Sequence, residues 1–168
     1  YESVNFAILK NLPVLFICEN NLYSVYSPLK VRQPERRKIH KMVKAFGIES
    51  TSGDGNNVSE VFNITKEAIK KIKSGGGPQF IEFSTYRWLE HCGPNYDNNI
   101  GYRSEKEFRE WEKNDPIRHC EDKLLSLSDK EINQIKEKAQ LEIDKAFDFA
   151  KKSPFPEPEQ AFMGLFKK

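Results

Sequence analysis

Residues 13–24 read PVLFICENNLYS, an apolar run that passes directly into a pair of asparagines. The run Val14–Cys18 has no polar interruption, which is typical of a strand covered on both faces inside a parallel sheet. Asn20 and Asn21 follow where such a strand would end. In open parallel sheets, ligands bind at the carboxyl ends of the strands. The stretch therefore predicts a buried strand with a polar, ligand-facing end.

The segments that follow predict alternating helices and strands. Apolar residues recur at helical spacing through residues 58–73, and Asn57 stands where a helix cap would lie. Residues 79–86 alternate and end in β-branched and aromatic residues, as strands do. We also expect helices over residues 1–10 and 35–46, the second stopped by Gly47, and a strand between the helices at 35–46 and 58–73.

The second half of the chain predicts a long loop and a long helix. Residues 87–103, RWLEHCGPNYDNNIGYR, show no period and many turn-forming residues, and loops of that length are usually functional or disordered. SDKE at residues 128–131 matches a capping box and opens an amphipathic helix that reaches Ala150. The whole order predicts an α/β fold, in which a mostly parallel sheet is flanked by helices.

Length and composition predict a single globular domain over residues 1–168, with a proline-rich C-terminal tail at residues 154–168. No apolar run approaches the length of a membrane span, and no signal-peptide pattern begins the chain. The three cysteines include no CxxC pair, which indicates a reducing compartment. We therefore expect a cytoplasmic protein without a membrane partner.

The charge pattern gives little support for nucleic-acid binding. The formal net charge is only +2, so no nucleic-acid partner is expected on global grounds. Residues 30–44 are locally basic but lack interleaved aromatic residues, and we interpret them mainly as a solvated loop and helix face. A contact with phosphate or nucleic acid is the minor alternative. The basic residues are Lys30, Arg32, Arg36, Arg37, Lys38, Lys41 and Lys44.

Asn20 and Asn21 allow two interpretations from the residues alone. A side-chain amide oxygen and a backbone carbonyl are hard ligands, which suit Mg²⁺ bound through one or two protein groups and substrate phosphates. Asparagines also make simple turns after strands. The local sequence leaves both interpretations open.

Five segments together resemble one enzyme family. They are NFAILKNLPVLFICENNLYSVYSP, GDGNNVSEVFNITKEAI, GGGPQFIEFSTYRWLEH, YRSEKEFREWEKNDPI and FAKKSPFPEP. In this order they resemble the alpha subunits of thiamine diphosphate-dependent 2-oxo acid dehydrogenases, the first components of the pyruvate, branched-chain and acetoin dehydrogenase complexes. The resemblance covers nearly the whole chain and corresponds to the C-terminal portion of such a subunit.

The resemblance implies the thiamine diphosphate-binding fold and part of its cofactor site. Asn21 matches the family's magnesium-binding asparagine, and Tyr23 matches the position whose backbone carbonyl binds the metal. Ser24 falls where the family backbone passes close to the diphosphate, and Asn20 is the less favoured ligand of the pair. The implied cofactors are thiamine diphosphate and Mg²⁺.

GDG at residues 53–55 looks like the family's metal motif but stands in the wrong place. In the family, the GDG whose aspartate binds magnesium precedes the asparagine pair, whereas this one follows it and matches a later turn into a helix. We therefore expect Asp54 to be a loop residue near a strand end and not a metal ligand. The matching aspartate would lie before Tyr1, so the isolated chain is expected to be inactive and to bind the cofactor weakly or not at all.

His91 matches the family's loop histidine, which follows the pair Tyr86-Arg87. The resemblance implies that it works near the cofactor diphosphate and the reacting centre, where an imidazole can donate to an anion or exchange a proton near neutral pH. Many relatives continue with a serine-rich HSxSD, the segment that is phosphorylated in mitochondrial forms. CGPNYD follows the histidine here, so we expect no such phosphorylation switch. Asp97 is the candidate for the family's acidic residue, and Arg103 could anchor the loop through a carboxylate pair.

The implied activity is decarboxylation of a 2-oxo acid and transfer of the acyl group to a lipoyl arm. In the family a beta subunit completes the active site, so the implied partners are a beta subunit and a second alpha chain in a heterotetramer, and a lipoyl-bearing acyltransferase. Asn21 and Tyr23 would hold the metal and diphosphate, and His91 would be catalytic. Neither the particular 2-oxo acid nor an acetoin alternative is decided by the residues.

Two other classes stay open. One is a non-catalytic fragment that acts only as a structural or subunit-interaction module. The other is a different doubly wound nucleotide-binding protein, which would need a glycine-rich phosphate loop after a strand. SGGGP at residues 74–78 precedes a strand and cannot present its amides at a helix start, so this second class is disfavoured.

Overall fold

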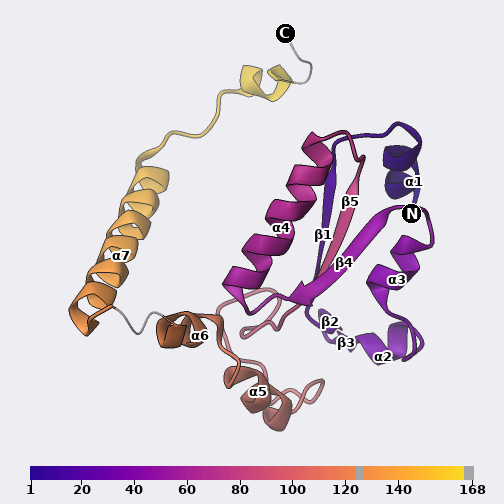
Figure 1. Ribbon diagram of the computed structural model, residues 1–168. Helices are drawn as coiled ribbons and strands as arrows, with labels where there is room; N and C mark the ends of the chain where they lie inside the picture. The colour runs from indigo at the N-terminus through magenta and orange to yellow at the C-terminus, as the bar shows by residue number, and fades with distance from the viewer. Residues whose placement is uncertain (124–126, 165–168) are drawn as a thin grey trace. The chain divides into compact units, whose positions relative to one another are not determined.

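A computed structural model describes residues 1–123 and 127–164 (Figure 1). The chain divides into two compact units, Tyr1–Lys123 and Leu124–Lys168, and each is described by itself. The expectation of one domain over residues 1–168 stays a prediction.

A three-stranded parallel sheet forms the centre of the first unit. The strands β1 (Leu15–Asn20), β5 (Gln79–Ser84) and β4 (Glu49–Asp54) lie in the spatial order β1-β5-β4. Their register places the last residues of all three strands on one row, so the carboxyl ends meet at one edge of the sheet. The predicted α/β fold with a parallel sheet is confirmed.

Helices cover both faces of this sheet because the buried middle strand alternates its side chains between two hydrophobic clusters (Figure 1). Phe80 belongs to the cluster under α1 (Glu2–Leu9) and α3 (Ile39–Lys44). Ile81 points the other way, into the cluster under α4 (Val58–Lys73). The sheet is therefore flanked by helices, as predicted.

β1 is half-buried, so the prediction of a strand covered on both faces was wrong for this chain. It is an edge strand of the sheet, and Ile17 is 52% exposed. The strand also extends beyond the apolar run and ends at Asn20. Position in the sheet decides this exposure, and an apolar run does not report that position.

The helix expected over residues 35–46 is shorter than predicted, because α3 begins only at Ile39. The chain turns first, and the Arg37 N–H donates to the Pro34 carbonyl at 2.9 Å. An earlier start would have placed several cations at the positive end of the helix dipole. Gly47 follows the helix with φ +93°, in the left-handed region that the sequence predicted for a stop.

Several short elements complete the first unit. β2 (Tyr23–Ser24) and β3 (Ser27–Pro28) form an antiparallel hairpin, and α2 (Leu29–Arg32) follows it. After the irregular loop over residues 87–103, α5 (Glu105–Glu112) and α6 (Pro116–Lys123) end the unit. None of these five elements was predicted.

The second unit contains one long helix in its described residues. α7 (Asp129–Lys152) begins at the predicted capping box, with both bonds between Ser128 and Glu131 present. The proline-rich tail is described as far as residue 164 and holds a short 3-10 helix, η1 (Pro158–Phe162). Across residues 1–123 and 127–164, no helix has the length and apolar character needed to cross a membrane.

Candidate functional site

The carboxyl edge of the sheet joins three turns, one after each strand. The Gly55 N–H donates to the Ser84 carbonyl at 2.7 Å, and the Thr85 N–H donates to the Asn20 carbonyl at 3.1 Å. A Cβ atom at residue 55 would lie 2.8 Å from the Ser84 oxygen, so only glycine fits this approach. The three strand ends are therefore locked to one another by backbone contacts.

The turn between β1 and β2 is held by two consecutive asparagine side chains. Asn20 Oδ1 accepts from the Leu22 N–H at 3.2 Å, and Asn21 Oδ1 accepts from the Tyr23 N–H at 3.0 Å. Leu22 in this turn adopts φ +68°, and Val25, in the hairpin turn between β2 and β3, adopts φ +55°. They are two of the three non-glycine residues with positive φ in the described ranges. Such backbone strain is costly and gathers at functional sites. The β1–β2 turn is therefore the leading candidate for a ligand site.

The donor chemistry of this turn fits part of a magnesium site. Asn21 Oδ1 accepts the hydrogen bond from the Tyr23 N–H with one lone pair. This bond orients the amide and leaves the second lone pair for a cation. Mg²⁺ prefers oxygen ligands and usually binds through one or two protein groups and substrate phosphates. The described residues hold no cluster of three or more histidine, cysteine or acidic side chains that could bind a metal. The turn thus fits Mg²⁺ when a phosphate group accompanies it.

Tyr23 anchors this turn to α5 through its side chain. The phenol donates to the Glu107 carboxylate at 2.6 Å, and the ring packs edge-on against Tyr102 with 5.3 Å between centroids. Burial, and then the hydrogen bond to Glu107, raise the pKa of Tyr23 far above its ordinary value. The side chain is therefore committed to the fold, and the backbone is the part of Tyr23 that a ligand could use. Ser24, the next residue of the hairpin, is exposed.

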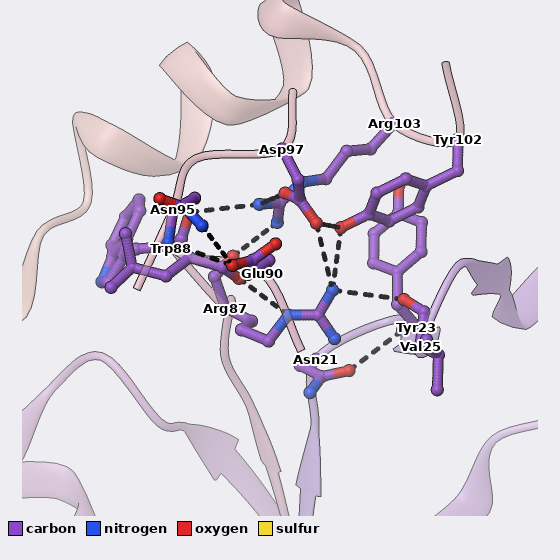
Figure 2. A network of polar contacts seen from close by, with 11 residues as sticks. Asn21, Tyr23, Val25, Arg87, Trp88, Glu90, Asn95, Asp97, Tyr102 and Arg103 are labelled. Carbon is purple, nitrogen blue, oxygen red and sulfur yellow. Dashed lines mark hydrogen bonds and ion pairs between the residues drawn. The ribbon is translucent and has the colours of Figure 1, made fainter. Parts of the chain in front are cut away.

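A buried ion pair organises the loop over residues 87–103 (Figure 2). Asp97 pairs with Arg103, and the two side chains are 4% and 0% exposed. Burial alone would raise the pKa of Asp97, but the hydrogen bonds from Tyr102 and Arg103 and the charges of Arg103 and Arg87 hold that pKa below its ordinary value. Arg103 also donates to the Arg87 carbonyl. The prediction that Arg103 anchors the loop through a carboxylate is confirmed.

Arg87 joins this network to the β2–β3 hairpin, which directly follows the asparagine turn. Its guanidinium donates to the Tyr102 hydroxyl at 2.8 Å and to the Val25 carbonyl at 3.2 Å, and both contacts are drawn in Figure 2. The Tyr102 hydroxyl donates in turn to Asp97 at 2.6 Å. Burial and this bond raise the pKa of Tyr102 to about 12. The loop and the β2–β3 hairpin therefore form one hydrogen-bonded unit next to the asparagine turn.

His91 lies at an exposed tip of the loop, outside this network. Glu90 and Asn95 close the base of the tip: the Asn95 amide donates to the Glu90 carboxylate at 2.7 Å, and the Glu90 N–H donates to the Asn95 carbonyl at 2.8 Å. Among the described residues, no hydrogen bond or ion pair holds the His91 ring. The structure thus brings Asn21, Tyr23 and Ser24 together in one turn, and the catalytic role of His91 stays a prediction.

The GDGNN segment forms the turn from β4 into α4, as predicted. Asp54 is the last residue of β4, and its Oδ1 accepts from the Asn56 N–H at 2.9 Å. Asn57 caps α4 by accepting from the Glu60 N–H at 3.3 Å. Asp54 therefore helps to shape a helix entry. That it is no metal ligand stays a prediction.

Two supporting residues were not singled out by the sequence. Glu107 holds the Tyr23 phenol, and Glu82 accepts from the Asn20 side chain at 2.7 Å. Glu107 sits in a helix that was not predicted. Glu82 lies inside the apolar strand QFIEFS. A charged residue in such a strand is unusual, and this could have identified Glu82 from the sequence.

The parallel sheet and the polar, strained turn at its carboxyl edge define an α/β protein with a candidate ligand site at the strand ends. The model of the family described as "Dehydrogenase E1 component" matches residues 1–159. The chain therefore belongs to the dehydrogenase E1 component family.

Similar proteins carry the names of alpha subunits. The "pyruvate dehydrogenase E1 component subunit alpha" of Porphyra purpurea is 31% identical over 170 residues, which cover 99% of this chain and 48% of that protein. The "2-oxoisovalerate dehydrogenase subunit alpha" of Bacillus subtilis strain 168 is 30% identical over 171 residues, which cover 100% of this chain and 51% of that protein. The "pyruvate dehydrogenase E1 component subunit alpha" of Staphylococcus aureus is 35% identical over 150 residues, which cover 87% of this chain and 40% of that protein. The chain thus spans about half the length of these curated relatives, and the family predicted from its five segments is confirmed.

Proposed function

We propose that this chain is part of the alpha subunit of a thiamine diphosphate- and Mg²⁺-dependent 2-oxo acid dehydrogenase, in which it binds the diphosphate end of the cofactor. The strained β1–β2 turn carries the proposal, because it offers the Asn21 amide oxygen and the Tyr23 carbonyl at the carboxyl edge of a parallel sheet. Both donors are neutral, so the negative charge that Mg²⁺ requires would come from the diphosphate and from groups outside this turn.

Each residue of the turn has a separate task in this proposal. Asn21 and the Tyr23 carbonyl would hold Mg²⁺, and Ser24 would lie beside the diphosphate. When bound, thiamine diphosphate supplies the electron sink for decarboxylation of a 2-oxo acid. Arg87 donates to the Val25 carbonyl of the adjoining β2–β3 hairpin and would fix that hairpin beside the turn before the ligand arrives, which lowers the entropic cost of binding. His91 would exchange a proton near the reacting atoms.

The proposed assembly contains further chains. A beta subunit and a second alpha chain would complete the active site in a heterotetramer, and a lipoyl-bearing acyltransferase would receive the acyl group. The names of the relatives, "E1 component" and "subunit alpha", support a multi-chain complex for those proteins. A non-catalytic interaction module is the alternative function.

A chimeric subunit tests this proposal. The chain would replace the matching region of the Bacillus subtilis relative, and the chimera would be purified with the beta subunit of that dehydrogenase. We expect CO₂ release from 2-oxoisovalerate that requires both Mg²⁺ and thiamine diphosphate and is abolished by Asn21→Ala. A chimera that assembles with the beta subunit but binds no cofactor would favour the alternative module.

The chain alone gives a second test. Two neutral donors cannot replace an anionic ligand of Mg²⁺, so the isolated chain should bind thiamine diphosphate weakly or not at all. Titration calorimetry of the isolated chain with Mg²⁺ and the cofactor measures this directly. Micromolar binding would contradict the division of the site between this chain and other segments.

A further inference from the structure

Glu82 is a buried carboxylate that the proposed activity does not use. It lies on β5, the middle strand, and is 7% exposed. Its Oε1 accepts from the Asn20 side-chain amide at 2.7 Å, and its Oε2 accepts from the His40 N–H at 2.8 Å and lies 2.8 Å from His40 Nδ1. A charge in a buried strand is costly unless it is fully bonded. Both oxygens of Glu82 are bonded, one toward α3 and one toward the β1–β2 turn.

Asn20 relays the position of Glu82 to the turn. An amide whose NH₂ group donates to Glu82 presents its oxygen to the opposite side, where the Leu22 N–H donates to it at 3.2 Å. That bond accompanies the left-handed conformation of Leu22, which stands between Asn21 and Tyr23. If the Asn20 amide turned over, its NH₂ group would face the Leu22 N–H and the bond would be lost.

We propose that Glu82 is a positioning residue of the cofactor-binding turn. By orienting the Asn20 amide it sets the backbone of Leu22, and with it the direction of the Asn21 side chain and the Tyr23 carbonyl. The inference rests on the function proposed above, and it assigns Asn20 a role as a relay instead of a ligand. Groups that orient metal ligands typically contribute about 10- to 100-fold to metal affinity.

Glu82→Gln separates this role from a purely structural one. The oxygen of the new amide can still accept from the His40 N–H, so a residue that only fastens α3 would tolerate the change. Its NH₂ group, however, would then face Asn20, which would have to turn over and release Leu22. In the double variant Asn20→Asp with Glu82→Gln, the new carboxylate accepts from that NH₂ group and from Leu22 at unchanged net charge. The double variant should therefore restore the turn.

Two measurements report on the turn independently of activity. The first is the exchange rate of the Leu22 amide, followed by NMR in the full chain without ligand. The second is the dissociation constant of thiamine diphosphate in Mg²⁺, measured by calorimetry in the chimera. We expect Glu82→Gln to raise both at least about tenfold, and the double variant to return both to within about threefold of the unsubstituted protein. Glu49→Gln, which removes an exposed carboxylate from β4, should change neither.

Several results would overturn the inference. Glu82→Gln could leave Leu22 exchange unchanged, the double variant could fail to restore it, or the turn could loosen without any change in cofactor affinity. If Glu82→Gln does not fold, Asn20→Ala removes the same relay while keeping the Glu82–His40 contact, and the same losses are expected. An unsubstituted chimera that folds without binding cofactor would refute the proposed function, and the cofactor part of the inference with it. The Leu22 rates would still decide whether Glu82 positions the turn.

Discussion

Two turns at the same edge of the sheet carry an asparagine pair, and they differ in what those asparagines do. The pair after β4 serves the fold. Asn56 is 3% exposed, donates to the Asn114 carbonyl and accepts from the Thr85 hydroxyl, both at 2.9 Å. Asn57 caps α4. The side-chain oxygens of both residues accept hydrogen bonds inside the protein, and no residue of 53–57 has a positive φ.

The pair after β1 is arranged differently. Asn21 makes one bond to the Tyr23 N–H and keeps acceptor capacity, while Leu22 and Val25 hold strained backbone conformations. A hydrogen bond from Arg87 to the Val25 carbonyl holds the adjoining β2–β3 hairpin turn in place. Residue type therefore does not distinguish a ligand-binding turn from a structural one. The two turns differ instead in the unused hydrogen-bonding capacity of their asparagines and in backbone strain that contacts with distant residues maintain.

The largest expected effect concerns the buried Asp97–Arg103 network of the loop, which supports the β2–β3 hairpin next to the turn after β1. Asp97→Ala leaves Arg103, whose side chain is 0% exposed, without its counter-charge, so the first unit should lose about 3–5 kcal/mol of unfolding free energy. Urea unfolding followed by tryptophan fluorescence measures this, because Trp88 and Trp111 both lie in the first unit. Glu112→Gln, which removes one of the two exposed carboxylate partners of Arg109, should cost less than about 1 kcal/mol. Equal losses in the two variants would count against the network.

Acid should weaken the same network, because it protonates Asp97. The loss of unfolding free energy should be smaller than in Asp97→Ala, because a protonated carboxyl can still accept hydrogen bonds. The folded-state pKa of Asp97 lies below its ordinary value of about 4. Its contribution is therefore complete above the ordinary value and is lost as pH falls from there through the lower folded-state pKa. The difference in unfolding free energy between the unsubstituted chain and Asp97→Ala should stay constant from about pH 7 to pH 5 and shrink below about pH 4. The pH dependence of Glu82, whose pKa is also lowered, cancels in this difference. Shrinkage above pH 5 would point to another group.

Asn56→Ala tests whether the turn after β4 serves only the fold. It removes two buried hydrogen bonds of about 1 kcal/mol each, so we expect a loss of about 2 kcal/mol in the same urea measurement. Its effect on cofactor affinity should be small, because Asn56 serves only the fold. A normal stability with weakened cofactor binding would reverse the roles assigned to the two turns.

Asn57→Ala should have the smallest effect, about 1 kcal/mol, because it removes the cap of α4 and one exposed contact, in which Lys123 Nζ donates to the Asn57 oxygen at 3.4 Å. Asn57→Ser keeps a capping oxygen and is the matched control, expected within about 0.5 kcal/mol of the unsubstituted chain. Thermal unfolding monitored by tryptophan fluorescence compares the two. An unstable Asn57→Ser variant would show that the side chain does more than cap the helix.

The sequence predicted the elements whose signal is local. α4, β5 and the capping box of α7 appear close to their predicted bounds, because helical periodicity, alternation and S-x-x-E patterns are each contained within a few residues. The same pattern stands at Ser104–Glu107, where Ser104 accepts from the Glu107 N–H at 3.1 Å. α5 could therefore have been predicted from its cap, although it is short and highly charged.

The supports of the site could not be predicted in this way. Glu82 and Asn20 are 62 residues apart in sequence, and Tyr23 and Glu107 are 84 apart. Periodicity indicates which face of an element is buried, but not which side chain it meets. The family resemblance named Asn21 and Tyr23, yet it gave no information on what holds them.

One calorimetric comparison tests the central claim, that the turn after β1 and not the one after β4 holds the cofactor. Thiamine diphosphate in Mg²⁺ would be titrated into the chimeric enzyme carrying Asn21→Ala or Asn56→Ala. We predict at least about a 100-fold loss of affinity for Asn21→Ala, which is the upper range for groups that merely orient metal ligands, and less than about a threefold loss for Asn56→Ala. Unchanged affinity in Asn21→Ala, or an equal loss in Asn56→Ala, would contradict it.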